Sequence, residues 1–204
     1  MAETVGAERA GAPRAMIVHG YWSAPDRNWF PWLAGRLEAD GYEVARPAMP
    51  DSKHPDKTAW HTAMRAALPS GDMDGRTLLV GHSLGCYGVL SYLQGCELAE
   101  PVAGVVLAAG FDRALSSEAP DLDLINAFVA APLDFDRLRA SARAFTVISS
   151  VDDPIVPHEY SRALAERLGA TFTPRRSGGH LMGSEGVTEL PEAYEALRRM
   201  MPGR

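Results

Sequence analysis

A Gly-His-Ser-Leu-Gly stretch at the end of an apolar run is the feature that most constrains how this chain can fold. Residues 77–80 have the composition of a buried strand, and residues 87–94, after the motif, are compatible with a helix. A serine between two glycines at a strand-to-helix turn is typical of a nucleophile elbow, where a strained backbone exposes the hydroxyl. A Cβ at Gly81 or Gly85 would collide where strand and helix cross. We therefore predict that Ser83 is a nucleophile; the alternative is an ordinary turn with a solvated serine.

Apolar runs alternate with amphipathic segments along the rest of the chain, and no internal repeat is present. This alternation predicts a parallel sheet with helices on both faces. The segment 111–144 should hold one or two short helices and supply the crossover between two strands. The other strand-like runs are residues 15–18, 42–45, 102–109, 145–150 and 170–173, and the other helical segments are residues 29–40, 58–68, 158–168 and 190–200.

Composition limits the class of protein. At 204 residues, one domain is expected over residues 14–204, after an alanine-, glycine- and charge-rich segment, 1–13, expected to be disordered. The formal charge of −6 argues against nucleic-acid and membrane partners, which favour a basic face. The two cysteines, Cys86 and Cys96, do not form a disulfide framework, and no apolar run reaches the roughly 18 residues of a membrane span. We therefore expect a cytoplasmic protein.

A serine hydroxyl needs a base within hydrogen-bond reach and a group that orients the base. His180 is the candidate base, because it follows the last predicted strand in a glycine-rich loop. Asp152 and Asp153, after another buried run, compete for the orienting acid. We expect Asp153 to orient His180 and Asp152 to form the turn. The resulting chain order of nucleophile, acid and histidine is the one that accompanies this kind of elbow.

The other histidines are weaker candidates for the base. His82 should point away from the serine through the turn, and His158 should be a surface residue in the first turn of a helix. His54 and His61 have no acid placed for them. His19, after the first strand, is expected to brace its loop.

Two backbone amides should stabilise the oxyanion that forms during acyl transfer. One belongs to Leu84, at the start of the helix after the serine. The other is expected from Tyr21, because Gly20 lets the backbone after the first strand bend toward the serine; Trp22 is the fallback.

These motifs together resemble a known family. The matching residues are His19-Gly20-Tyr21, the aromatic run to Trp29 and Trp32, Gly81-His82-Ser83-Leu84-Gly85-Cys86, Asp152-Asp153-Pro154 and Gly178-Gly179-His180. They look like the small serine hydrolases of the retinoblastoma-binding-protein-9-like (YdeN-like) family, in the α/β-hydrolase superfamily, over about residues 16–200. The resemblance implies a compact α/β-hydrolase fold with a mostly parallel sheet of about six strands, and Ser83, Asp153 and His180 as the triad.

The function expected from these residues is cleavage of small ester or amide bonds through an acyl-enzyme, without cofactor or metal. A C–C bond hydrolase or lactonase with the same triad is the first alternative, and a non-catalytic binding module of the same fold is the second. Binding to a retinoblastoma-type protein is not expected, because residues 84–88 lack the glutamate of Leu-x-Cys-x-Glu.

The segment 111–144 is too short to supply more than a minimal cap. One short apolar helix from this segment, carrying Phe128, is expected over the serine, and Tyr21, Trp22 and Trp29 are expected to form the opposite wall. Core packing is the alternative for Trp29. A pocket built in this way should be shallow and apolar and should favour short acyl groups.

Overall fold

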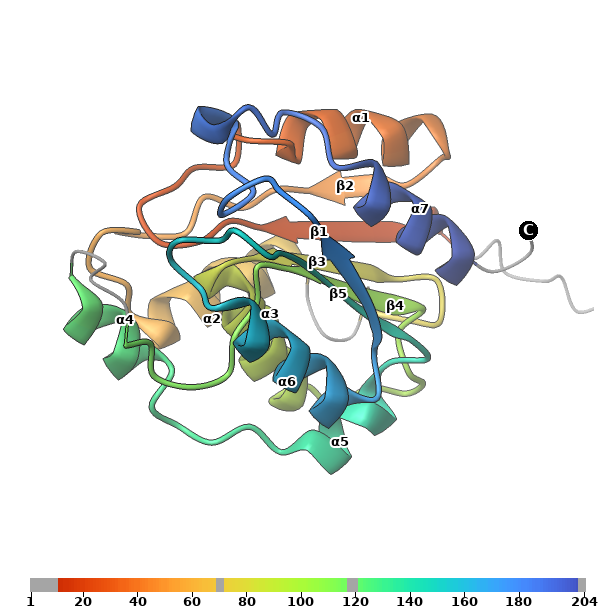
Figure 1. Ribbon diagram of the computed structural model, residues 1–204. Coiled ribbons are helices and arrows are strands. Elements are labelled where there is room, and N and C mark those ends of the chain that lie inside the picture. Colours follow the sequence, from red (N-terminus) through yellow and green to blue (C-terminus); the bar gives the residue numbers. More distant parts are fainter. Residues whose placement is uncertain (1–10, 69–71, 117–120, 202–204) are drawn as a thin grey trace, which may run out of the picture.

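In the described part of the chain, six strands form one parallel sheet at the centre of the fold (Figure 1). The computed structural model describes residues 11–68, 72–116 and 121–201. The strands are β1 (Arg14–Val18), β2 (Glu43–Ala45), β3 (Leu78–His82), β4 (Gly104–Ala108), β5 (Phe145–Ser150) and β6 (Thr171–Arg175). Their order is β2-β1-β3-β4-β5-β6, and every neighbouring pair is parallel. The predicted parallel sheet of about six strands is confirmed.

Helices cover both faces of this sheet, as predicted. One face carries α1 (Phe30–Ala39) and α7 (Pro191–Met200) (Figure 1). On the other face lie α2 (Lys57–Ala67), α3 (Leu84–Gln94), α4 (Leu122–Phe128), α5 (Phe135–Ser141) and α6 (His158–Leu168). Because both faces are covered, every residue of β3, β4 and β5 is buried. This burial explains why these strands are nearly continuous apolar runs in the sequence.

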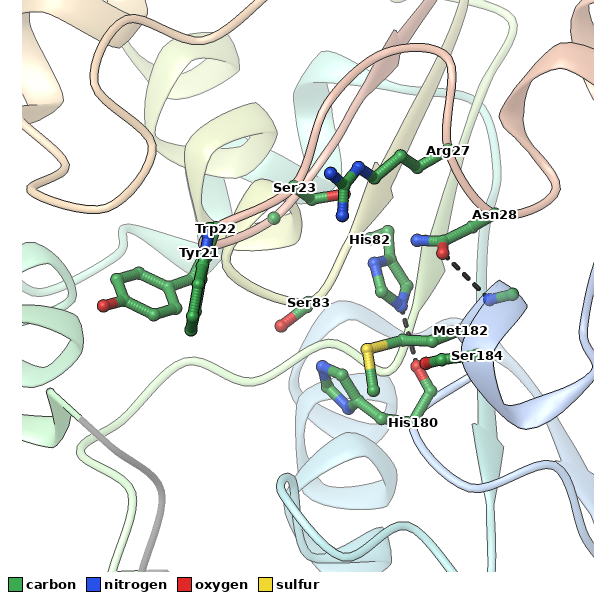
Figure 2. A pocket seen from close by; sticks show the side chains of 12 residues that line it. Tyr21, Trp22, Ser23, Arg27, Asn28, His82, Ser83, His180, Met182 and Ser184 are labelled. Atoms are coloured by element: carbon green, nitrogen blue, oxygen red, sulfur yellow. Dashed lines mark hydrogen bonds between the residues drawn. The ribbon is translucent and has the colours of Figure 1, made fainter.

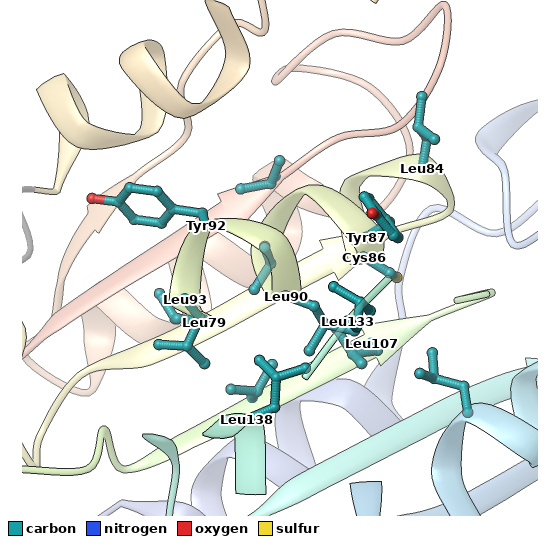
Figure 3. Packing of buried hydrophobic residues seen from close by; sticks show 14 of the residues in the cluster. Leu79, Leu84, Cys86, Tyr87, Leu90, Tyr92, Leu93, Leu107, Leu133 and Leu138 are labelled. Atoms are coloured by element: carbon teal, nitrogen blue, oxygen red, sulfur yellow. The ribbon is translucent and has the colours of Figure 1, made fainter. Parts of the chain in front are cut away.

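Helix α3 is the centre of the larger hydrophobic cluster. Its residues from Leu84 to Leu93 are all buried, so it is apolar around its whole circumference. Figure 3 shows it against Leu79 of β3 and Leu107 of β4, with Leu138 of α5 nearby. The helix that follows Ser83 is therefore held rigidly by packing on every side.

Local signals explain where several helices begin and end. The side chain of Asp56 accepts a hydrogen bond from the backbone N–H of Ala59, at 2.7 Å, and caps the start of α2. Helix α6 ends at Gly169, which has a φ of 65° in the left-handed region that glycine tolerates. The short helices expected in the segment 111–144 are α4 and α5, although residues 117–120 lie outside the described part of the chain.

The strand order reverses direction between β1 and β3. In parallel sheets a ligand binds beyond the carboxyl ends of the strands at such a switch point. The residues that follow these two strands here are His19-Gly20-Tyr21 and Ser83. The topology therefore places the predicted nucleophile at the expected ligand site.

Most of the N-terminal segment expected to be disordered, residues 1–10, lies outside the described chain. The Gly11 carbonyl accepts a hydrogen bond from Arg76 Nη1 at 2.6 Å, and the Pro13 carbonyl accepts one from the Glu43 N–H at 2.9 Å. Cys86 and Cys96 are both buried and free. Of the helices in the described ranges, none has the length and apolar character needed to cross a membrane.

Candidate active site

Ser83 lies in a strained backbone turn between β3 and α3. Its φ of 54° and ψ of −126° are unfavourable for a residue with a side chain. A Cβ at Gly81 would lie 2.7 Å from Cys86 Cα, and one at Gly85 would lie 2.5 Å from the Val18 carbonyl oxygen. The predicted strain and the predicted need for both glycines are therefore present in the structure.

The loop after β1 packs directly against this elbow. A Cβ at Gly20 would come within 2.9 Å of Ser83 Cβ and 3.3 Å of the Leu84 nitrogen. Tyr21, the next residue, lines the same space as Ser83. The structure thus brings together the two residues expected to donate to an oxyanion. The Trp22 N–H, considered as a fallback, instead donates to the Ser52 carbonyl at 2.9 Å.

His180 and Asp153 form a buried pair. His180 Nδ1 lies 2.9 Å from Asp153 Oδ2 and 3.1 Å from Oδ1, with the two side chains only 5% and 0% exposed. The carboxylate accepts the Nδ1 proton, which leaves Nε2 free to take a proton. His180 and Ser83 line the same cavities (Figure 2), although no hydrogen bond joins them within the described chain. Such bonds are often long in unliganded hydrolases.

The two aspartates divide their work differently from the prediction. Asp152, expected to form the turn, accepts from the N–H of Gly179 at 3.1 Å and of Gly178 at 3.4 Å. Asp153 itself stabilises the turn, because its Oδ1 accepts from the N–H groups of Ile155 and Val156 at 2.8 and 2.9 Å. Asp152 therefore holds the loop that carries His180, while Asp153 contacts both the turn and the imidazole.

His82 also contacts the loop that carries His180. Its Nε2 lies 2.8 Å from the His180 carbonyl oxygen, and a carbonyl can only accept, so Nε2 carries the proton. Its Nδ1 is buried and has no partner in the described chain. Burial lowers the pKa of His82 to about 3, and the nearby His180 adds to the effect. His82 thus stays neutral and makes no hydrogen bond to Ser83 in the described chain, although both line the polar cavity described below. It positions His180, a role that the sequence did not reveal.

The remaining histidines do not reach the serine. His19 donates from Nδ1 to the Gly20 carbonyl at 2.9 Å and accepts from the Met49 N–H at 3.0 Å, so it braces its loop as expected. His158 is half-buried against Ser149 and is not the surface residue that was predicted. The expectation that His54 lacks an acid is also wrong, because Asp51 Oδ1 lies 3.2 Å from its Nδ1. That pair is exposed.

Two cavities of different character meet at Ser83 and His180. A polar cavity of about 290 Å³ extends toward Ser23, Arg27, Asn28 and Ser184 (Figure 2). An apolar cavity of about 190 Å³ extends toward α4 and is lined by Phe111, Leu115, Ile125 and Ile155. Tyr21, Trp22 and Met182 border both. The expected pocket was apolar only.

The structure corrects two of the three predicted pocket residues. Trp22 lines both cavities and is 57% exposed. Trp29 is fully buried among Phe30 and His82, on the α1 side of the sheet, and its Nε1 donates to the Leu181 carbonyl at 3.1 Å. Phe128, the last residue of α4, packs on Trp60 and Tyr87. Neither Trp29 nor Phe128 is among the described residues that line the two cavities, because neighbouring aromatic rings enclose both.

Helix α4 forms a small cap that is tied to the loop after β1. Ile125 of α4 lines the apolar cavity, and the Tyr21 hydroxyl donates to Asp121 Oδ2 at 2.5 Å. Desolvation and this carboxylate raise the pKa of Tyr21 to about 12. The hydroxyl therefore stays protonated and keeps donating.

Sequence reasoning missed Arg27 and Asn28 as lining residues. Both follow β1, and the general rule for parallel sheets places such loops at the ligand site, so position was the available signal. In the described ranges, no group of three or more histidine, cysteine, aspartate or glutamate side chains is arranged to hold a metal ion.

Comparisons with known proteins agree with this geometry. The model of the family described as serine hydrolase matches residues 15–199. The protein YdeN of Bacillus subtilis (strain 168) is 35% identical over 181 residues, covering 89% of this chain and 92% of YdeN. The serine hydrolase RBBP9 of Rattus norvegicus is 23% identical over 195 residues, covering 94% and 97%. The crystal structure of the B. subtilis ydeN gene product superposes with a TM-score of 0.85 at 33% identity, covering 92% of this chain and 97% of that one.

Proposed function

This chain belongs to the serine hydrolase family, and we propose that it cleaves small esters or amides through an acyl-enzyme on Ser83. The observation that carries the proposal is the strained elbow of Ser83 beside the buried His180–Asp153 pair. A serine, a free imidazole nitrogen and an orienting carboxylate are the groups that acyl transfer requires.

In the proposed reaction, the Ser83 Oγ attacks the substrate carbonyl carbon while His180 Nε2 takes the hydroxyl proton. The charge on the carbonyl oxygen is stabilised by the backbone N–H groups of Tyr21 and Leu84. His180 then gives its proton to the leaving alcohol or amine as the bond to the carbonyl carbon breaks. Water, activated by the same imidazole, hydrolyses the acyl-enzyme and restores the free serine. Asp153 keeps His180 in the required tautomer throughout.

The apolar cavity supports a short acyl group. This cavity has a volume of about 190 Å³, and Leu115, Ile125 and Ile155 form part of its wall. Methylenes beyond this wall would find no apolar surface to bury against, so they would add no binding energy. We therefore expect good hydrolysis of acetyl to butyryl esters and a steep decline by about eight carbons.

The test is a 4-nitrophenyl ester series assayed with the wild-type protein and with Ser83→Ala. We expect Ser83→Ala to lose on the order of 10⁴-fold or more in kcat with an unchanged circular dichroism spectrum. A fluorophosphonate should label the wild type and not the variant, which separates an enzyme from a non-catalytic binding module. Adding a lactone and a β-diketone to the series tests the lactonase and C–C bond hydrolase alternatives. Equal turnover by Ser83→Ala would overturn the proposal.

We keep a cytoplasmic location and a small-molecule substrate, without nucleic-acid, membrane or retinoblastoma-type partners, as part of the proposal. The buried free thiols of Cys86 and Cys96 are compatible with a reducing compartment.

A further inference from the structure

The polar cavity contains a single permanently charged side chain. Among its described lining residues, Arg27 is the one cation and no aspartate or glutamate is present. In Figure 2 the Arg27 side chain extends from the loop after β1 across the cavity, with its guanidinium between Ser23 and His82. Arg27 therefore contributes the permanent positive charge among the described lining residues of this cavity.

The guanidinium of Arg27 is exposed and has no hydrogen-bond or ion-pair partner within the described chain, whereas other arginines do. Arg46 donates to the Pro25 carbonyl at 2.7 Å, and Arg76 pairs with Asp74 at 2.6 Å. The carboxylate of Asp121, at the start of α4, accepts a hydrogen bond from the Tyr21 hydroxyl and not from Arg27. The side-chain donors of Arg27 are consequently available to a ligand, while its backbone N–H donates to the Ala24 carbonyl at 3.2 Å.

Asn28 adds a second, fixed donor to the same cavity. Its Oδ1 accepts from the Gly183 N–H at 2.9 Å. Because an N–H can only donate, the contacting atom of Asn28 must be the oxygen, and the amide NH₂ is left on the other side. Figure 2 shows that this group faces into the cavity. Asn28 has a φ of 54°, a left-handed conformation that asparagine adopts more readily than most residues with a side chain.

We infer that the substrate carries an anionic group, a carboxylate or a phosphate, that Arg27 and Asn28 bind in the polar cavity. This inference rests on the proposed function and names the substrate class: a short ester or amide with one apolar end and one anionic end. The planar fork of a guanidinium matches the two oxygens of either anion, and the Asn28 amide can donate to the same group. The apolar cavity has no charged lining residue in the described chain, so the anionic end has one place to bind.

Two matched substrate pairs test the inference and show which side of the ester carries the charge. For the alcohol side, the pair is the acetate ester of 4-hydroxybenzoate and that of methyl 4-hydroxybenzoate. For the acyl side, the pair is 4-nitrophenyl hydrogen succinate and its methyl ester. For each pair the readout is the ratio of kcat/KM for the charged and the neutral member. Intrinsic reactivity cancels when the same ratio is compared between protein variants.

We expect Arg27→Met to lower this ratio on the order of 10- to 100-fold in one of the two pairs, as for loss of a charge-assisted hydrogen bond. Arg27→Lys should fall between the wild type and Arg27→Met, because it keeps the charge and loses the fork. Lys53→Met is the matched control: Lys53 Nζ lies 4.3 Å from the Trp22 ring centre, but Lys53 is not a lining residue. An unchanged ratio in both pairs for Arg27→Met, or an equal fall for Lys53→Met, overturns the inference.

A binding measurement separates failure of this inference from failure of the proposed function. In the Ser83→Ala background, benzoate and phenyl phosphate should raise the melting temperature, and adding Arg27→Met should abolish the rise. If no ester is hydrolysed but this shift occurs, the proposed function fails and the anion site stands. If esters are hydrolysed but neither anion shifts the melting temperature, the anion site fails and the proposed function stands.

Discussion

The two halves of the candidate site are built in opposite ways. Ser83 is held by its own strand and helix, through a backbone so tight that Gly81 and Gly85 leave no room for a Cβ. His180 lies in a loop with little regular structure, between β6 and the 3₁₀ turn Gly183–Glu185. Its position depends on side chains from elsewhere in the chain. A nucleophile can thus be fixed by local backbone, while its base is fixed by distant hydrogen bonds.

In the described chain, four side chains from distant parts of the sequence bind the backbone of the segment 178–183, and the nearby Glu185 accepts from the Met182 N–H at 3.1 Å. Asp152 lies 26 and 27 residues from the amides it binds, and His82 lies 98 residues from His180. Trp29 and Asn28 are 152 and 155 residues from their partners in the segment. Asp152 follows β5, His82 is the last residue of β3, and Asn28 and Trp29 directly precede α1. The loop is therefore as precise as the fold that brings these segments together.

The sharpest test of this comparison is the pair Asp153→Asn and Asp152→Asn. An amide at 153 would favour the wrong tautomer of His180, so we expect kcat to fall by about 10³- to 10⁴-fold. Asp152→Asn removes only a loop anchor and should cost about tenfold or less, because Asn can still accept from one glycine N–H. Steady-state kinetics on a 4-nitrophenyl ester gives both values. If the two losses were reversed, the assignment of the orienting acid would be wrong.

A smaller effect is expected from His82→Phe. The ring would still fit beside Trp29 and Phe30, but the buried His180 carbonyl would lose its donor, at a cost of about 1–3 kcal/mol in the free energy of unfolding. We expect kcat to fall about tenfold while fluorophosphonate labelling of Ser83 persists at a reduced rate. His61→Phe is the control. It breaks a hydrogen bond to Ser91, 2.8 Å long, away from the site, and should affect stability without changing kcat. Equal kcat losses in the two variants would contradict a positioning role for His82.

The smallest expected effect is on the pH dependence of stability. Burial lowers the pKa of His82 to about 3, whereas a histidine in the unfolded chain titrates near about 6.5. Below that unfolded value the unfolded chain binds a proton that the folded protein does not bind. The contribution of neutral His82 to the free energy of unfolding is thus fully present above about pH 6.5. It is lost as the pH falls toward the pKa of His82 in the folded protein, at up to about 1.4 kcal/mol per pH unit.

Urea unfolding of the wild type and of His82→Phe at pH 7, 6 and 5 measures how the free energy of unfolding of each protein depends on pH. We expect the free energy of unfolding of His82→Phe to decline less steeply on acidification, because one buried neutral histidine has been removed. Parallel declines in the two proteins would show that His82 is not kept neutral by burial.

The sequence alone allowed the sheet, its helices and the elbow to be predicted, because each depends on neighbouring residues. Strands buried on both faces need continuous apolar runs. Glycine is needed at positions 81 and 85 because the backbone passes so close to them at the turn between β3 and α3 that a Cβ would collide. Asp153 and His180 could be proposed because each follows a strand at the edge where the carboxyl ends of parallel strands meet.

Only the tertiary structure decided which side chains face the serine and which are enclosed. Trp29 and Asn28 are adjacent in sequence, yet Trp29 is buried under α1 while Asn28 lines the polar cavity. Phe128 and Ile125 belong to the same short helix. Of these two residues, Ile125 lines the apolar cavity and Phe128 is not among its described lining residues. Such differences depend on contacts with residues far away in the chain, and neither composition nor local periodicity specifies those contacts.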